Sequence, residues 1–394
     1  MTENTKIFTG QYILLCLSSL LFFSSFNMLI PELPDYITKM GGEEYKGLII
    51  GIFTLTAGFS RPFSGQLTDR WGRIPVMMVG AMVCVVCGFF YPLVNTVFLF
   101  LALRLVHGFS TGFKPTATAA YIADIVPTQR RGEAMGIYGF VTSLGMAMGP
   151  FVGSWIARLF DLNVLFYASS VFAFLSVAIL FSMSETLLPQ KREPFSLSMF
   201  KVKWKDVFYP NVWPVTVIVF TSAFAYGTVI TLAPDLTKIV GLTNKGIYYL
   251  VFTLSSLLIR ILAGKLSDKQ GRVNVLIAGA TCLIMALLST SIAQVHFFYF
   301  GSFLFGVAWG IISPSYQAWT IDLCTEETRG RAVATMYIAL EAGIGAGAVL
   351  PMLLYNNRAD RIGWAFQSAA IVAVLGLAFL LWYKRKVETK WARA

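Results

Sequence analysis

The sequence predicts an all-α protein that crosses a membrane several times, and three observations indicate this fold class. The 394 residues are 56% hydrophobic and only 13% charged, whereas a soluble domain carries about 25% charged residues. The apolar residues form runs of roughly 20, the length of helix that crosses a hydrocarbon core of about 30 Å. The runs do not show the polar and apolar alternation of membrane β-strands.

Twelve apolar segments are predicted to be transmembrane helices, and the longest polar interval divides them into six and six. We expect a six-helix bundle over residues 1–183, a cytoplasmic linker over 184–211, and a second bundle with a short basic cytoplasmic tail over 212–394. The first segment follows a short polar start without a cleavage pattern and is expected to be a retained span. The predicted spans are 10–33, 47–65, 75–93, 96–118, 134–156, 163–183, 212–234, 246–264, 273–292, 297–319, 332–354 and 362–383.

A charged loop appears twice, once in each half. Residues 65–76 read GQLTDRWGRIPV and residues 264–275 read GKLSDKQGRVNV, with six of twelve positions identical. The wider segments 51–73 and 250–272 share nine identities, which include Arg61 and Arg260. These loops follow the second and the eighth predicted span, so they occupy equivalent places in the two halves.

A second set of matches relates the halves at an offset of 198 residues. It pairs Gly112 with Gly310 and Asp124 with Asp322. It also pairs Gly108 with Gly306, Gly145 with Gly343, and Gly149 with Gly347. We therefore expect two pseudo-symmetric bundles, an architecture that alternates access to a site near the middle of the membrane.

The distribution of Lys and Arg predicts that both termini lie in the cytoplasm. With that orientation 20 basic residues fall in cytoplasmic segments, seven in extracellular loops and four inside spans, as the positive-inside rule requires. The net charge of +11 is then explained by topology, so we expect contact with a lipid bilayer and no nucleic-acid partner. The predicted location is the inner (cytoplasmic) cell membrane.

The first charged loop resembles the signature of the major facilitator superfamily. That signature is Gly-x-x-x-Asp-Arg-x-Gly-Arg, here Gly65, Asp69, Arg70, Gly72 and Arg73. The resemblance implies a twelve-helix transporter that works by rocking its two bundles. It also implies that the loop, with Asp268 and Arg272 of the weaker second copy, acts as a conformational latch at the cytoplasmic face.

Two further motifs resemble the twelve-span drug:H+ antiporter branch of that superfamily. Residues 145–154 read GMAMGPFVGS and are similar to Gly-x-x-x-Gly-Pro-x-x-Gly-Gly, through Gly145, Gly149, Pro150 and Gly153, with Ser154 in place of the last glycine. Arg104-x-x-His107-Gly108 is similar to an Arg-x-x-Gln-Gly element, with His in place of Gln. Small residues at this spacing also allow simple close packing of helices, which is the alternative interpretation.

Ionisable residues inside predicted spans are expensive and mark candidate functional positions. In the fourth span Arg104, His107, Thr111 and Lys114 recur at helical spacing, so they share one face. The resemblance implies that this span lines a central cavity. The alternative is that Arg104 pairs with Glu32 or Asp35 and holds helices together.

The predicted substrate site includes aromatic and amide side chains from other spans. Trp309, Tyr316 and Gln317 fall close to one face of the tenth span, and this mixture suits an amphiphilic organic substrate. Asn27 of the first span and Tyr226 of the seventh complete the predicted set. Packing between helices is the alternative role for such an aromatic stripe.

Proton coupling is predicted to involve carboxylates and one histidine. Glu341 lies inside the eleventh span, and we expect it to approach Arg61 across the seam between the bundles. Glu32 and Asp35 lie at the extracellular end of the first span, and His107 can titrate near neutral pH. Many antiporters of the branch carry an acid in the middle of span 1, where this chain has Asn27, so the proton site departs from the family pattern.

Together these features predict a secondary transporter, most simply a proton-coupled exporter of small amphiphilic molecules or drugs. The alternative is uptake or exchange of an anionic, zwitterionic or sugar-like solute, which the basic residues of span 4 favour. The sequence shows neither a phosphate-binding Gly-Lys-Ser/Thr motif nor a metal-ligand cluster. We therefore expect no enzyme activity, no cofactor, no bound metal, and a monomer whose partners are its substrate and protons.

Overall fold

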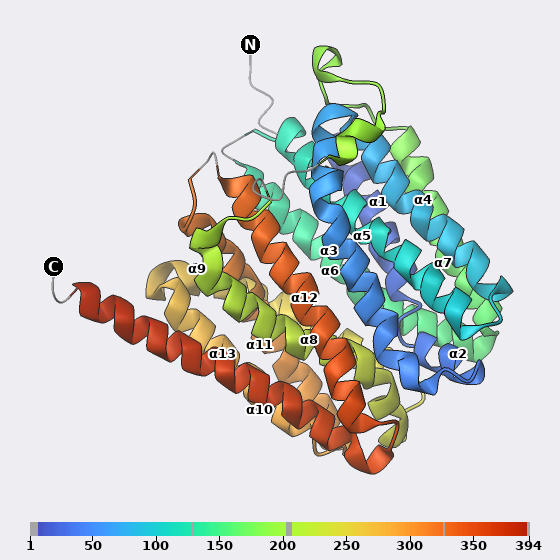
Figure 1. Cartoon of the computed structure of the whole chain (residues 1–394), viewed down its shortest axis with the longest axis vertical. Helices are drawn as coiled ribbons and strands as arrows, with labels where there is room; N and C mark the ends of the chain where they lie inside the picture. Colours follow the sequence, from blue (N-terminus) through green and yellow to red (C-terminus); the bar gives the residue numbers. More distant parts are fainter. Residues whose placement is uncertain (1–6, 128–129, 202–206, 326–327, 392–394) are drawn as a thin grey trace. The chain divides into compact units, whose positions relative to one another are not determined.

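The computed structural model describes residues 7–127, 130–201, 207–325 and 328–391, without the side chains of 261–266, 268 and 387–391. The regular structure of the described residues is helical (Figure 1). The long helices of the first half are α1 (Gly10–Asn27), α3 (Lys46–Arg70), α4 (Arg73–Phe90), α5 (Val97–Ile125), α6 (Arg131–Leu159) and α7 (Leu162–Phe181). Those of the second half are α8 (Trp213–Ile239), α9 (Ile247–Gln270), α10 (Arg272–Thr290), α11 (Val295–Asp322), α12 (Arg329–Tyr355) and α13 (Ile362–Trp391).

These twelve long helices of the described chain correspond one to one with the predicted spans, which confirms the fold class. Ten of them are long and apolar enough to cross a membrane by length and composition. The other two, α3 and α9, are the pair related by the charged repeat. Each carries an arginine within the helix, Arg61 or Arg260, and each ends in the charged loop.

The predicted end of the first span is wrong by several residues. It was expected to run to residue 33, but α1 ends at Asn27, and a turn leads to the short helix α2 (Leu33–Lys39). Pro31 and Pro34 explain the break, because proline has no N–H to donate to the preceding turn. Four other helices, α3, α6, α11 and α12, exceed their predicted spans at both ends; α6, for example, covers 131–159 rather than 134–156.

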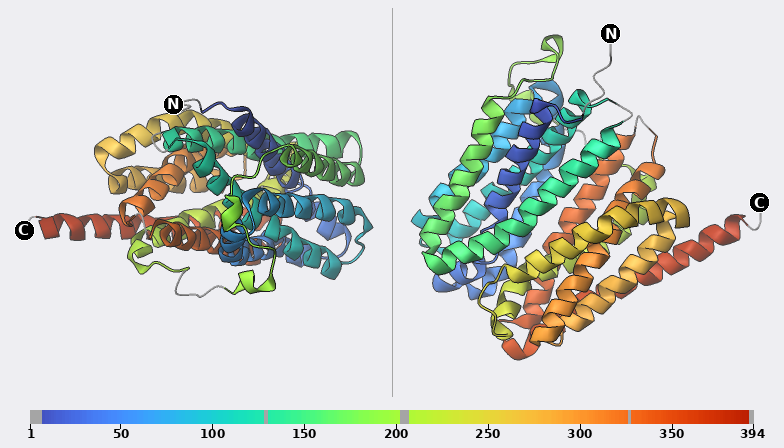
Figure 2. Two further views of the ribbon diagram at one scale, coloured as in Figure 1. Left: turned by 90° about the horizontal axis from the view of Figure 1, so that it is seen from above. Right: turned by 180° about the vertical axis from the view of Figure 1, so that it is seen from behind.

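The polar cap residues explain several helix starts. Thr9, Thr96 and Asp161 each accept a hydrogen bond from a backbone N–H in the first turn of α1, α5 and α7, respectively. Such side chains satisfy donors that the helix itself leaves unpaired. At the other end of the chain, α13 continues through the basic segment that was predicted to be a tail, and its last turns project beyond the helices of its own unit (Figure 2).

The described chain forms two compact units. Unit 1 comprises residues 1–41 and 55–205, and unit 2 comprises 42–54 and 206–394. These groupings differ from the predicted boundaries in two places. Residues 42–54, which include the start of α3, group with the second unit, and most of the linker groups with the first.

The same helix pairs pack together in both units, as expected for a repeat. In unit 1 the main contacts join α1 with α6 and α7, and α4 with α5 and α7. In unit 2 the equivalent contacts join α8 with α12 and α13, and α10 with α11 and α13, and α9 also packs closely against α11. When the long helices are counted in chain order, the helices of each such pair in unit 2 lie six places after those of the equivalent pair in unit 1. The internal repeat seen in the sequence is therefore also a repeat of packing.

Glycines bring the paired helices into backbone contact. In unit 1, a Cβ atom at Gly145 of α6 would lie 2.8 Å from the carbonyl oxygen of Leu20, and one at Gly149 would lie 2.9 Å from that of Ser24. At Gly153 a Cβ would overlap the carbonyl of Met28. The motif glycines of α6 thus contact α1 once per turn.

The equivalent contacts recur in unit 2. A Cβ at Gly343 of α12 would lie 2.5 Å from the carbonyl oxygen of Phe220 on α8, and one at Gly347 would overlap the carbonyl of Phe224. Gly112 of α5 and Gly310 of α11 contact α3 and α9 in the same way. Three of these glycines, Gly145, Gly149 and Gly112, are repeat partners of glycines that perform the same function in unit 2.

We predict that Gly153→Ala lowers the thermal unfolding midpoint of the purified protein in detergent by roughly 5 °C, because overpacking of a tight contact costs about 1–3 kcal/mol. Gly136→Ala is the matched control, since it lies on the same helix and a Cβ there meets nothing within 4 Å. Equal midpoints for the two variants would show that α1 and α6 separate easily.

Candidate functional site

The first charged loop is organised around Arg73 at the start of α4. The loop turns at Gly72, whose φ of 145° is rarely adopted by residues with a side chain. The Arg73 guanidinium donates hydrogen bonds to the backbone oxygen of Thr68 (2.5 Å) and to the carboxylates of Asp69 (3.2 Å) and Asp124 (3.0 Å). One arginine therefore joins the ends of α3, α4 and α5.

The second charged loop repeats the central ion pair. Its turn residue Gly271 has a φ of 84°, and the guanidinium of Arg272 donates to the carboxylate of Asp322 at 2.8 Å and to the Ser267 hydroxyl at 3.2 Å. Asp322 is the repeat partner of Asp124. The side chain of Asp268, which was predicted to belong to the latch, lies outside the described residues.

Of the two charged loops, the first is the one to which the structure describes linker contacts. Glu185 accepts hydrogen bonds from the backbone N–H groups of Arg73 (3.1 Å) and Ile74 (2.8 Å), so its carboxylate lies at the positive N-terminus of α4. Thr186 donates to Asp124 at 2.6 Å. The linker thus provides hydrogen-bond partners for the start of α4 and for Asp124. The structure describes no equivalent linker contact at the second loop.

A second part of the linker contacts the end of α3. Arg70 forms a bidentate ion pair with Glu193, and hydrogen bonding to this guanidinium lowers the pKa of the Glu193 carboxyl. Trp71 packs against Phe195 with ring centroids 5.3 Å apart. In the second loop the equivalents of Arg70 and Trp71 are Lys269 and Gln270, which cannot reproduce these two contacts.

The predicted polar face of α5 is buried within unit 1. Arg104 is 1% exposed and His107 is fully buried. The phenol of Tyr91 lies 3.1 Å from Nδ1 of His107 and accepts a long hydrogen bond from Arg104 at 3.5 Å. Nε2 of His107 lies 3.3 Å from the thiol of Cys84 on α4. Arg104 and His107 therefore belong to one hydrogen-bonded chain that links α5 with α4.

Lys114, on the same face of α5, is also buried, at 1% exposed. Its amine donates to the Ser18 hydroxyl (2.7 Å), the Ser18 carbonyl (3.1 Å) and the Ser176 hydroxyl (2.7 Å). Ser18 belongs to α1 and Ser176 to α7, so Lys114 joins three helices. The remaining predicted residue of this face, Thr111, is half-buried and donates to the carbonyl of Gly108.

The acidic residues near the C-terminal end of α1 lie in different surroundings. Glu32 is buried, and its carboxylate accepts a hydrogen bond of 2.7 Å from Ser154 of α6. Asp35 is half-buried in the first turn of α2. Asn27, at the end of α1, is buried and donates to the carbonyl of Phe23. Ser154 is the residue that departs from the glycine motif, and here it is the partner of a buried acid.

In unit 2, two predicted substrate residues contact each other. Tyr226 of α8 and Trp309 of α11 stack with ring centroids 4.7 Å apart. Phe305 of α11 and Phe252 of α9 extend this group, with Phe252 lying 6.0 Å from Tyr226 and 5.4 Å from Phe305 between ring centroids. We call these four residues the aromatic cluster. Phe252 was missed at the sequence level, because a phenylalanine in an apolar span carries no distinguishing signal.

A polar group lies further along α11, toward its C-terminal end. Arg260 of α9 donates to Ser313 at 3.4 Å, and the amide of Gln317 donates to the same hydroxyl at 3.2 Å. Gln317 is exposed, whereas Tyr316 is 3% exposed. Glu341 of α12 is buried at 8% exposed. Arg61 belongs to unit 1 and Glu341 to unit 2, and their pairing stays a prediction.

A buried ion pair that the sequence did not predict lies in unit 2. The amine of Lys46, at the start of α3, is 3.0 Å from the carboxylate of Asp235 near the end of α8, and both side chains are 7% exposed. In the same segment Gly47 packs against the backbone of Ala348 and Val349 on α12. These contacts explain why the first turns of α3 group with unit 2.

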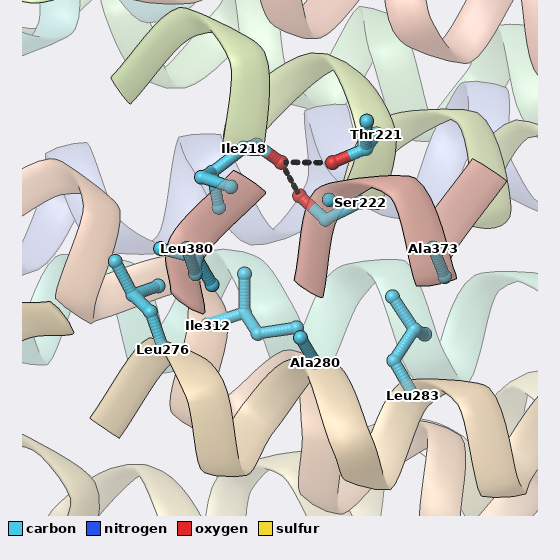
Figure 3. A pocket seen from close by; sticks show the side chains of 10 residues that line it. Ile218, Thr221, Ser222, Leu276, Ala280, Leu283, Ile312, Ala373 and Leu380 are labelled. Carbon is cyan, nitrogen blue, oxygen red and sulfur yellow. Dashed lines mark hydrogen bonds between the residues drawn. The ribbon is translucent and has the colours of Figure 1, made fainter. Parts of the chain in front are cut away.

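A small pocket between α8, α10, α11 and α13 contains none of the predicted site residues (Figure 3). The hydroxyls of Thr221 and Ser222 border it, but both donate to the Ile218 carbonyl of their own helix, as the dashed lines in Figure 3 show. Its other lining side chains are apolar. The residues that the structure describes also contain no group of three His, Cys, Asp or Glu side chains that could hold a metal ion.

The matching halves, the repeated arginine–aspartate pairs and the glycine contacts agree with one family. The model of the Major Facilitator Superfamily matches residues 15–324 and 217–394. The chain belongs to this superfamily. It is therefore a multi-pass membrane transporter of small molecules and not an enzyme.

Named relatives and solved structures of the superfamily resemble the chain over most of its length. It is 26% identical over 392 residues to multidrug resistance protein 2 of Bacillus subtilis, covering 95% of each. It is 28% identical over 308 residues to the multidrug resistance efflux pump PmrA of Streptococcus pneumoniae, covering 75% of this chain and 76% of that protein. The crystal structure of the human organic anion transporter MFSD10 has the same fold, with a TM-score of 0.73 at 19% identity over 94% of this chain and 98% of that one.

We predict that Asp124→Asn speeds trypsin cleavage after Lys191 and Arg192 several-fold, because the substitution weakens the contact that holds Thr186 and Arg73 together. Asp322→Asn is the matched control: it breaks the equivalent pair with Arg272, to which the described linker is not attached. Cleavage is followed by gel electrophoresis of the purified protein. Unchanged cleavage of Asp124→Asn would show that the linker is held independently of Asp124.

Proposed function

We propose that this protein exports small amphiphilic organic molecules in exchange for protons, by alternating access between its two bundles. The observation that carries this proposal is the aromatic cluster, in which Tyr226 and Trp309 stack while both are partly exposed. Aromatic faces bind apolar ring systems and attract organic cations. The names of the relatives, which are multidrug resistance proteins and efflux pumps, support export as the direction.

The remaining predicted roles fit this proposal. The candidates for proton coupling are Glu32, which is held by Ser154, and Asp35, His107 and Glu341. An ion pair of Arg61 with Glu341 between the bundles would break as the bundles rock. The first charged loop would act as the latch, through Arg73 and its neighbours Gly65, Asp69 and Arg70. In the second charged loop Arg272 would have the same role. We propose that the protein works as a monomer in the inner cell membrane with both termini in the cytoplasm.

A second candidate function is transport of an anionic or zwitterionic solute. The observation that favours it is the pair of buried cations on α5, Arg104 and Lys114, both 1% exposed. A cation in a low-dielectric interior attracts an anion more strongly than the same cation does in water. In this case the aromatic cluster would have a packing role only.

Dye transport into liposomes distinguishes the two functions. The purified protein is reconstituted, an interior-acid pH gradient is imposed, and uptake of cationic ethidium and anionic carboxyfluorescein is followed by fluorescence. Protein molecules that are inserted with their cytoplasmic face toward the outer medium should accumulate ethidium in the liposome lumen. A protonophore should abolish this accumulation. Gradient-driven accumulation of carboxyfluorescein alone would favour the second candidate, and ethidium movement that ignores the gradient would exclude proton coupling.

We predict that Trp309→Ala raises the ethidium concentration for half-maximal transport about tenfold, since loss of an aromatic partner costs on the order of 1.4 kcal/mol. Trp364→Ala is the matched control, because this tryptophan of α13 is 66% exposed and lies outside the cluster. The same increase in both variants would contradict a substrate role for the aromatic cluster.

A further inference from the structure

Lys114 lies close to the middle of α5, which runs from Val97 to Ile125 in a helix long and apolar enough to cross a membrane. Burying a charged amine at this depth costs free energy, so its presence indicates a function. The side chain is among the largest fully buried ones of the described chain. Its position therefore calls for an explanation other than anchoring at a membrane surface.

The groups around Lys114 are neutral. α1 presents Ser18 and Phe22, whose ring centroid is 5.0 Å from the amine, and α7 presents Ser176. From α4 the titratable group that faces it is the thiol of Cys84, and on α5 itself Arg104 and His107 lie further toward the N-terminus. Within the described part of the chain, no carboxylate forms an ion pair with Lys114.

The other buried lysine provides a contrast. Lys46 has comparable burial but is paired with Asp235 at 3.0 Å. An amine beside a carboxylate is fixed in its charged form, because loss of the proton would leave an unpaired buried anion. Lys114 is not constrained in this way, so its charge can change without leaving an opposite charge behind.

The hydrogen bonds around Lys114 suit both forms of the amine. The ammonium has three N–H donors, and three acceptors surround it: the carbonyl and hydroxyl of Ser18 and the hydroxyl of Ser176. The two hydroxyls are 2.9 Å apart and also lie within hydrogen-bond distance of each other's backbone carbonyl. A neutral amine can accept from one hydroxyl after rotation, so neither state leaves a buried polar group without a partner.

A chain of titratable and polar side chains leads from this site toward the N-terminal end of α5. Cys84, the thiol that faces Lys114, is 3.3 Å from His107, and His107 is 3.1 Å from the Tyr91 phenol. The backbone carbonyl of Tyr91 accepts a hydrogen bond from Tyr36, which is half-buried at the end of the unit. These groups extend from Lys114 toward the side that we assign to the cell exterior.

We propose that Lys114 carries the coupling proton, an inference that rests on the proposed proton-coupled export. Its nitrogen lone pair takes a proton from hydronium at the outer face and forms an N–H bond, and a water molecule is released. After the bundles rock, the same kind of N–H bond breaks and the proton passes to water at the cytoplasmic face. Because its acceptors lie on α1 and α7, gain of the proton strengthens the contact of α5 with both helices.

The test compares three forms of the reconstituted protein in the ethidium assay. Lys114→Met should reduce gradient-driven accumulation at least tenfold, with residual downhill movement that no longer responds to the gradient. Lys114→Arg should fail in the same way, because arginine does not release its proton. Recovery of gradient-driven transport in Lys114→Arg would show that the position needs only a cation, and would overturn the proposal. Retention of at least half the wild-type accumulation by Lys114→Met would do the same.

Ser176→Ala keeps the lysine and tests its surroundings. Removal of one acceptor disfavours the ammonium, so the midpoint of the pH profile of transport should move down by about one pH unit. Ser170→Ala, which removes another buried hydroxyl of α7, one that donates to the Val85 carbonyl, should leave the midpoint in place. An unshifted midpoint in active Ser176→Ala would contradict the proposal. Ethidium transport by wild-type protein without any gradient dependence would overturn the proposed coupling itself, and this inference with it.

Discussion

Backbone contact between helices at glycine positions is the interaction on which the rest of this structure depends. Inside a bilayer apolar side chains gain little by leaving lipid, so helix association relies on close packing and on hydrogen bonds between helices. Gly149 of α6, packed against α1, and Gly347 of α12, packed against α8, show how the sequence supplies that packing twice, at positions related by the repeat. Close approach then permits short hydrogen bonds, and that between Ser154 and Glu32 forms directly beside Gly153.

On this shared scaffold the two units differ in chemistry. Unit 1 places cations and hydroxyls in its interior: Arg104, His107 and Lys114 all lie on the inner face of α5. Unit 2 places aromatic rings at the equivalent helix, where Phe305 and Trp309 of α11 contact α8 and α9. A repeated backbone thus carries divergent side chains, and the proposed function places the Lys114 proton site in the first unit and the aromatic substrate contact in the second.

Periodicity and repetition predicted the helices and the repeat that relates them, because these features depend on apolar length and on local spacing. The partners of the charged groups were harder to predict. The offset of 198 residues singled out Asp124 and Asp322, yet only the folded chain shows that they bind Arg73 and Arg272. Ser18 and Ser176 carried no signal at all, since serine is common in membrane helices and their joint contact with Lys114 depends on three helices meeting. The early end of α1 was missed because the apolar run continues through Pro31, so composition outweighed the effect of proline on hydrogen bonding.

The attachment of the linker also limits the reach of the chain between the units. The linker hydrogen-bonds to unit 1 as far as Lys201, whose carbonyl accepts from Gln66, and Val207 and Tyr209 are bound by Thr335 of α12. Six peptide steps separate residues 201 and 207, and a fully extended chain of that length spans about 20 Å. The chain between these two attachments is therefore a short tether. While both attachments hold, covalent geometry forbids any rocking that would carry these two points more than about 20 Å apart.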